Sequence, residues 1–223
     1  MKMFLAGSWQ DCLEKIEVLN PYDGQPVDTV PKASLSDVET ALKSAFQGTQ
    51  PMRKLSGFDR FKILKRAAEL VEKQLEDLAR TITLEEGKIL AEARFEVSRT
   101  AETLMVSAEE AKRIAGEMIP LDGAPGAGNR MGFTLRVPCG VVLAISPFNF
   151  PLNLVAHKVG PAIAAGNSVI LKPASDTPLS ALKLTAILLE AGLPPAGIQC
   201  ITGSGGELGK ALCSDARVRK ITF

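Results

Sequence analysis

The stretch GVVLAISPFNFPLNLVAHKVGPAIAAGNSVILK, from Gly140 to Lys172, decides the fold. It begins with GVVLAIS, a continuous apolar run of the kind that forms a strand covered on both faces. The middle predicts a helix that Pro161 ends or kinks, and NSVILK predicts a second strand. Strand, helix and strand in this order predict a βαβ unit of a parallel sheet.

The same alternation continues to the last residue. PLSALKLTAILLEAG predicts a helix, GIQCIT a strand, GGELGKALCSD a short helix and VRKITF a further strand. We therefore expect the α/β class, with a Rossmann-like, doubly wound parallel sheet and right-handed crossovers. Ligands of such sheets bind outside the carboxyl ends of the strands. Those ends lie at 145–149, 171–175 and 202–205, so three loops should converge on one edge.

A helical segment precedes this sheet. Short strands are expected up to about Lys32. The pattern SDVE, starting at Ser36, is typical of a capping box and predicts a helix over 37–48. Apolar residues at steps of three and four predict a second helix from about Asp59. A third is expected from about Thr83 through GEMIP, with a break near EEGK.

Residues 119–139 are too rich in glycine and proline for a helix. They contain short runs of β type, so we expect a two-stranded arm that leaves the main body. The alternative is an ordinary surface loop, but structureless loops of about 20 residues are uncommon unless they have a function.

Composition excludes several classes of function. The net charge of +1 indicates no nucleic-acid or acidic-membrane surface. No apolar stretch is long enough for a membrane span. The apolar patch near the first residue is too short for a secretory signal. Four cysteines without CxxC spacing, beside one histidine, make a zinc or other metal site improbable. Free thiols fit a reducing compartment, hence the cytoplasm.

Asn149 lies between two prolines, directly after the first strand of the βαβ unit. Residues that precede proline avoid the α region, and Pro151 fits the first helical position. An asparagine held just outside a helix N-terminus can donate hydrogen bonds to a developing oxyanion. The alternative is a structural role, in which Asn149 caps the helix or its own turn.

Two further loops could hold a nucleotide. Lys172 ends a buried strand and can meet hydroxyls or phosphates, although it could also be a snorkelling lysine. Ser175 offers no carboxylate, and folds that select NAD usually place one against the ribose 2′-hydroxyl. TGSGGELG, from Thr202 to Gly209, follows a strand and opens a helix. Such a glycine-rich loop is either a close-approach site for a cofactor or a tight turn.

Together these loops resemble the aldehyde dehydrogenase superfamily. The resemblance rests on PFNFP, GPAIAAGNSVILKPAS, ITGSGGELG and VRKITF, and it extends through NPYDGQPVDTVPKAS and EEGKILAEARFEV nearer the start. PFNFPLNLVAHKVGPAIAAGN is similar to the branch with lactaldehyde, phosphonoacetaldehyde and non-phosphorylating glyceraldehyde-3-phosphate dehydrogenases. The family oxidises an aldehyde to a carboxylate with NAD or NADP. A cysteine thiolate attacks the carbonyl, hydride passes to the nicotinamide, and water hydrolyses the thioester.

The resemblance implies a role for each candidate residue. Asn149 would be the side-chain donor of the oxyanion hole. Residues 1–118 and 140–223 would form the NAD(P)-binding domain, incomplete at its C-terminal end, and 119–139 the oligomerisation arm of a homodimer or homotetramer. The residues that would contact the cofactor are Ile145, Ser146, Pro147, Phe148, Lys172, Ala174, Ser175, Gly205, Gly209 and Phe223. Because Ser175 replaces a glutamate common in NAD-preferring members, we expect NADP at least to be accepted.

The family's nucleophile and general base have no counterpart here. Family members are about twice this length, and Cys12, Cys139, Cys200 and Cys213 do not match the nucleophile's position. We therefore expect a cofactor-binding portion that lacks the catalytic cysteine domain and does not oxidise aldehydes alone. Two alternatives stay open: a related acyl-phosphate or acyl-CoA reductase, and a non-catalytic nucleotide-binding or assembly module.

Overall fold

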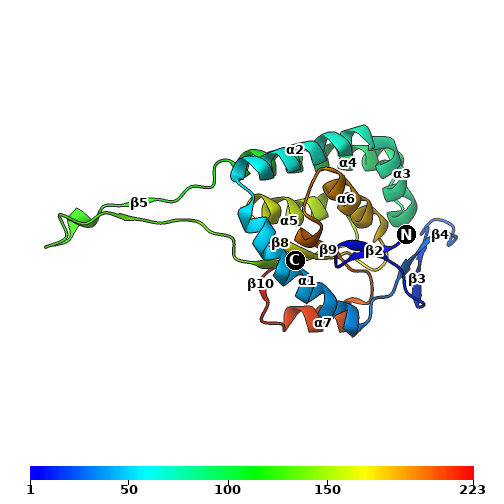
Figure 1. Cartoon of the computed structure of the whole chain (residues 1–223). Coiled ribbons are helices and arrows are strands. Elements are labelled where there is room, and N and C mark those ends of the chain that lie inside the picture. Colours follow the sequence, from blue (N-terminus) through cyan, green and yellow to red (C-terminus); the bar gives the residue numbers. More distant parts are fainter.

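A six-stranded sheet forms the centre of the molecule in the computed structural model, which describes residues 1–223 (Figure 1). Its strand order is β10-β7-β8-β9-β1-β2. The parallel strands are β7 (Val141–Ile145), β8 (Ser168–Lys172), β9 (Ile198–Cys200) and β10 (Val218–Thr222). Because β10 lies beside β7 on the side away from β8, the strand order reverses there, as in doubly wound folds. The expected fold class is confirmed.

The N-terminal strands add a feature that the sequence did not indicate. β1 (Met3–Leu5) and β2 (Ser8–Gln10) join the main sheet antiparallel, with Phe4 opposite Cys200 of β9. The expected parallel sheet is therefore mixed at this edge. A separate two-stranded sheet is formed by β3 (Lys15–Leu19) and β4 (Pro26–Pro31).

Helices cover both faces of the sheet, which explains the continuous apolar strands. Val141 and Leu143 face one core, with α1 (Leu35–Lys54) and α7 (Gly205–Cys213). Their neighbours Val142 and Ala144 face the larger core, as alternation along a strand requires. That core contains the crossover helices α5 (Asn153–Ala164) and α6 (Leu179–Glu190) and the N-terminal helices α2 (Gly57–Lys73), α3 (Leu75–Glu86) and α4 (Leu90–Ala111).

Several helix boundaries differ from the predictions. The capping box of α1 joins Ser34 and Asp37, so the predicted box from Ser36 was wrong by two residues. SLSDVE contains two overlapping boxes, and the pattern alone does not choose between them. Pro161 lies inside α5, which continues to Ala164 rather than ending at the proline.

The third predicted helix is two helices. Gly87, at φ 86°, ends α3, and α4 begins at Leu90, so the break expected near EEGK is present. The continuation through GEMIP was wrong, because Met118–Ile119 is strand β5. Likewise, the helix predicted from about Asp59 begins at Gly57 and ends at Lys73.

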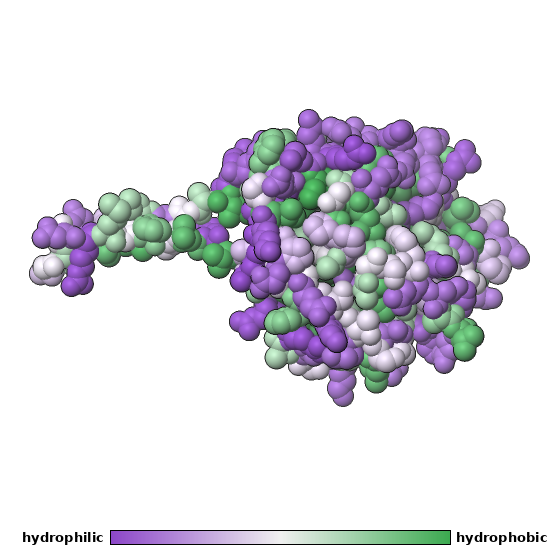
Figure 2. All heavy atoms as spheres, in the orientation of Figure 1, coloured by the Kyte–Doolittle hydropathy of each residue, from purple (hydrophilic) through white to green (hydrophobic).

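The two-stranded arm is present and extends far from the body (Figure 1). β5 pairs antiparallel with β6 (Gly132–Phe133). Apolar side chains lie uncovered along the arm, as the green surface in Figure 2 shows. They include Met118, Met131, Phe133, Leu135 and Val137. Contiguous exposed apolar residues of this kind are typical of interaction surfaces.

Candidate functional site

The carboxyl ends of the parallel strands bring three loops to one edge of the sheet. Ile145 and Lys172 are direct partners in β7 and β8, and the Ser146 amide donates to the Lys172 carbonyl at 3.2 Å. The Ser175 hydroxyl donates to the Gly203 carbonyl at 3.0 Å, which links the second loop to the third. The sequence predicted this convergence correctly.

Phe223 lies at the same edge. Thr222 of β10 pairs with Ala144, so Phe223 comes next to the end of β7. Its side chain is 94% exposed. The remaining β7-loop residues, Pro147, Phe148 and Asn149, are exposed as well.

The Asn149 side chain is not a helix cap. α5 begins at Asn153. Its N-cap residue is Leu152, and the side chain at this position makes no capping hydrogen bond. Pro151 therefore precedes the helix rather than occupying its first position. The interpretation of Asn149 as a structural cap was wrong, and its carboxamide is left free to bind a ligand.

A carboxylate from another helix satisfies the start of α5 instead. Glu96 Oε1 of α4 accepts hydrogen bonds from the amides of Leu152 and Asn153 at 3.0 and 3.1 Å. Its Oε2 accepts from Lys88 Nζ at 2.7 Å, and Lys88 Nζ also donates to the Asn149 carbonyl at 2.9 Å. The sequence analysis missed both residues. Glu96 could have been found from its position, because it is a charged residue within the buried apolar stripe of α4 that contains Ala93, Val97 and Leu104.

A second buried carboxylate repeats this arrangement at α6. Glu85 of α3 accepts from the amides of Leu179 and Ser180 at 2.6 and 2.9 Å, and α6 has no side-chain cap of its own. Burial raises the pKa of Glu85 to about 7, although the hydrogen bonds from Ser180 and Leu179 oppose that shift. The loop before α6 carries Lys172 and Ser175, so Glu85 supports the second loop as Glu96 supports the first.

Glu85→Gln should flatten the pH dependence of stability. The folded-state pKa of about 7 exceeds the ordinary value of 4.5, so the native state binds the proton more tightly. The stabilisation is therefore complete below about pH 4.5 and is lost as pH rises towards 7. The free energy of unfolding should fall by up to ~1.4 kcal/mol per pH unit in that window. Glutamine does not titrate, so this slope should disappear.

Urea unfolding at several pH values checks this prediction. Glu72→Gln, on the exposed face of α2, is the matched control and should keep the wild-type slope. Equal slopes in wild type and Glu85→Gln would contradict the prediction.

Lys172 is buried, and its ammonium has one partner within the chain. Nζ donates to the carbonyl of Pro173 at 2.9 Å, and burial lowers the pKa of the lysine. Lys172 is therefore not a snorkelling lysine whose ammonium is exposed to solvent. Two N–H groups remain for a ligand, because an ammonium carries three donors.

The glycine-rich loop leaves room for the close approach of a ligand. Gly205 opens α7 and Gly209 lies one turn further. A Cβ added at Gly205, Gly206 or Gly209 would meet no atom within 4 Å. The Ser146 hydroxyl, at the same edge, is buried without a hydrogen-bond partner. Open backbone, a helix N-terminus and unpaired polar groups together fit a dinucleotide.

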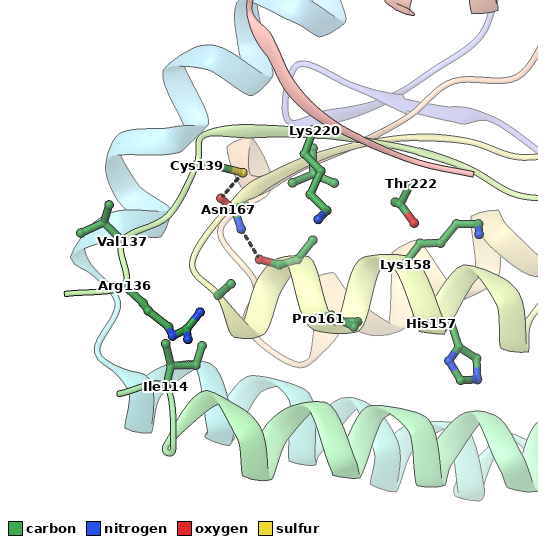
Figure 3. A pocket seen from close by; sticks show the side chains of 13 residues that line it. Ile114, Arg136, Val137, Cys139, His157, Lys158, Pro161, Asn167, Lys220 and Thr222 are labelled. Carbon is green, nitrogen blue, oxygen red and sulfur yellow. Dashed lines mark hydrogen bonds between the residues drawn. The ribbon is translucent and has the colours of Figure 1, made fainter. Parts of the chain in front are cut away.

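A cavity lies elsewhere, between α5, β10 and the base of the arm (Figure 3). Its volume is about 680 Å³. Arg136, His157, Lys158 and Lys220 contribute to its lining, which contains no carboxylate. In Figure 3, Lys158 and His157 extend from α5 and Lys220 from the edge strand. Neither Asn149 nor Lys172 lines this cavity, so we do not assign it to the three loops.

The four cysteines are free thiols. Cys200 is buried within β9, and burial raises its pKa to about 12, so its thiolate is not accessible at neutral pH. The Cys139 thiol donates a hydrogen bond to Asn167 Oδ1 at 3.3 Å. Cys213 is the last residue of α7. No group of three or more histidine, cysteine, aspartate or glutamate side chains could hold a metal ion. The helices also include none with the length and apolar character needed to cross a membrane.

Comparison with known proteins gives a consistent result. A model described as the aldehyde dehydrogenase family matches residues 9–223. The chain is similar to 3-sulfolactaldehyde dehydrogenase of Priestia aryabhattai, with 48% identity over 221 residues, 99% of this chain and 46% of the relative. It is also similar to succinate-semialdehyde dehydrogenase (NADP(+)) GabD of Escherichia coli (strain K12), with 40% identity over 98% of this chain and 45% of the relative.

Among solved structures, one similar chain is NADP-dependent glyceraldehyde-3-phosphate dehydrogenase from Bacillus halodurans C-125 complexed with NADP. The TM-score is 0.96 at 34% identity, and the match covers 100% of this chain and 47% of that one. The chain thus spans about half the length of the proteins it matches.

Proposed function

This chain belongs to the aldehyde dehydrogenase family, and from that premise we propose that it forms the cofactor-binding part of an NAD(P)-dependent aldehyde dehydrogenase. One observation carries the proposal. The carboxyl ends of β7, β8 and β9 bring the loops that carry Asn149, Lys172 and the open glycines of α7 to one edge of the sheet, the edge where doubly wound folds bind nucleotides.

Each loop has its own task in this proposal. The Lys172 ammonium holds the hydroxyls of the adenosine ribose, with Ala174 and Ser175 beside it. The backbone at Gly205 and Gly209 allows the adenine to approach, while Ile145, Ser146, Pro147, Phe148 and Phe223 line the cleft towards the nicotinamide. When bound, NAD(P) would supply the hydride acceptor for the oxidation of the aldehyde.

Asn149 acts on the substrate rather than on the cofactor. When a thiolate adds to the aldehyde carbonyl, the oxygen becomes an anion, and the Asn149 carboxamide donates a hydrogen bond to it. By the family resemblance, none of the four cysteines matches the position of the nucleophile that would provide that thiolate. We therefore propose that residues 1–223 alone do not oxidise aldehydes, which an assay for turnover checks directly.

The relatives support a class of substrate. Their names specify 3-sulfolactaldehyde, aspartate semialdehyde, succinate semialdehyde and glutarate semialdehyde. Each of these aldehydes carries an anionic sulfonate or carboxylate group. We propose an anionic aldehyde as the substrate of the complete reaction, and an assembly of two or four copies held through the apolar arm at 119–139.

Fluorescence titration of the 223-residue chain with NADPH tests the proposal. We expect saturable binding, and we expect Lys172→Met to weaken it about 10- to 100-fold, since a charge-assisted hydrogen bond is worth roughly 1.5–3 kcal/mol. Lys183→Met is the control and should leave Kd unchanged; it removes a lysine of α6 that pairs with Asp77 of α3. Absence of binding of both NADPH and NADH at millimolar concentration would refute the proposal.

A further inference from the structure

Asn149 is tied to the helical layer through its own carbonyl. The Lys88 ammonium donates to that carbonyl at 2.9 Å and lies 4.0 Å from the centre of the Phe150 ring. Lys88 itself stands at the break between α3 and α4, after the left-handed Gly87. The segment between Pro147 and Pro151 is therefore held by a residue about 60 positions earlier in the chain.

Glu96 completes the connection. Its side chain is 1% exposed, and the Lys88 side chain 9%. One carboxylate oxygen binds Lys88 at 2.7 Å, and the other binds the amides of Leu152 and Asn153. Thus one buried ion pair contacts the loop on both sides of Pro151.

We propose that Lys88 and Glu96 are positioning residues for Asn149, which fix the loop so that the carboxamide is aligned before substrate binds. This inference rests on the proposed function, because it concerns the oxyanion donor of that same site. The two prolines restrict the residues before them, but Asn149 itself keeps its ψ rotation. A fixed carbonyl removes that freedom, since the carbonyl turns with ψ.

A purely stabilising role is the competing explanation. Buried ion pairs often contribute little to net stability compared with apolar replacements. Apart from a longer contact between Lys88 and Glu86 at 3.9 Å, the other contacts of the pair fall on one loop. No other lysine of the chain bonds to that loop. This distribution of contacts favours positioning.

NMR relaxation on the 223-residue chain tests the proposal. Lys88→Met should lower the backbone order parameter of Asn149 from about 0.85, a rigid value, to below about 0.6. It should also increase the amplitude of motion of the Asn149 side-chain NH₂ group. The Leu152 and Asn153 amides should keep their slow hydrogen exchange, because Glu96 Oε1 still accepts from them. Lys88→Arg retains the charge and should restore much of the order at Asn149.

Two substitutions at Glu96 separate its contacts. Glu96→Gln retains an oxygen for the amides but presents an NH₂ group to Lys88, so Asn149 should loosen while amide exchange stays within a few-fold of wild type. Glu96→Ala removes both contacts, and exchange at Leu152 and Asn153 should rise about 10-fold or more. Lys62→Met is the matched control. Like Lys88, Lys62 of α2 pairs with a carboxylate, that of Asp59, and its ammonium lies 5.1 Å from the centre of a phenylalanine ring.

An unchanged order parameter at Asn149 in both Lys88→Met and Glu96→Gln would overturn the proposal. So would loosening spread evenly over α5, since that is the signature of general destabilisation. NADPH titration of the wild type is a separate measurement. If the wild type failed to bind, the proposed function would fall, whereas the relaxation comparison would still decide whether Lys88 and Glu96 hold the loop.

Discussion

Replacing Asn149 with alanine should lower kcat about 10²- to 10³-fold, the usual cost of removing one oxyanion-hole donor. The loss should appear in kcat because the oxyanion exists only after the thiolate has attacked. Stability should not change, since the side chain is exposed and does not cap α5. The assay requires a polypeptide with a complete active site. Residues 1–223 can replace the matching part of the E. coli relative, with which they share 40% identity.

Two controls make the Asn149 result interpretable. The thermal midpoint and the Kd for NADPH of the chimaera should be the same with and without the substitution. Asn149→Asp, of equal size, replaces the donor with an acceptor and should be at least as damaging as alanine. A kcat within about threefold of the unsubstituted chimaera, for either variant, would show that Asn149 is not the oxyanion donor.

Ser175→Glu should change the preference between the two cofactors. A carboxylate at this position would stand against the ribose 2′-position and repel a 2′-phosphate. Charges a few ångströms apart near a protein surface interact by about 2–4 kcal/mol, and salt reduces this. We expect the Kd for NADPH to rise about 10- to 100-fold while the Kd for NADH stays within about threefold.

Ser175→Ala is the control for the lost hydroxyl. It removes the hydrogen bond to the Gly203 carbonyl without adding charge, so both affinities should shift together. Asp176, exposed beside Ser175, already brings one carboxylate near the loop. If the wild type binds NADH much more tightly than NADPH, or if Ser175→Glu leaves the ratio unchanged, position 175 does not select the cofactor.

The sheet could be predicted because its signals are local. Strands covered on both faces are apolar throughout, as VVLAI and SVILK show. The polar residues at their ends then fall on one edge by topology alone. In contrast, the edge pairing of β1 with β9 joins residues nearly 200 positions apart, and nothing within either segment indicates it.

The supports of the site could not be predicted for a similar reason. Glu96 and Glu85 each bind amides that lie 56 to 95 positions later in the chain. A glutamate in a helix is ordinarily a solvated surface charge, and only its place within an apolar stripe distinguishes these two. The helix starts at Leu35 and Gly57 were each predicted two residues too late. There the local signals were present in the sequence but were ambiguous by a few residues.

The use of α3 and α4 to cap the crossover helices also limits how far this site can be transplanted. The loop PFNFP is short enough to be grafted as a sequence onto another Rossmann-like scaffold. Here the two crossover helices lack side-chain caps of their own, and the missing groups belong to helices that precede the parallel strands in the sequence. A graft that takes only the strands and their loops would leave four backbone amides without acceptors, so the smallest transferable unit includes residues 75–111.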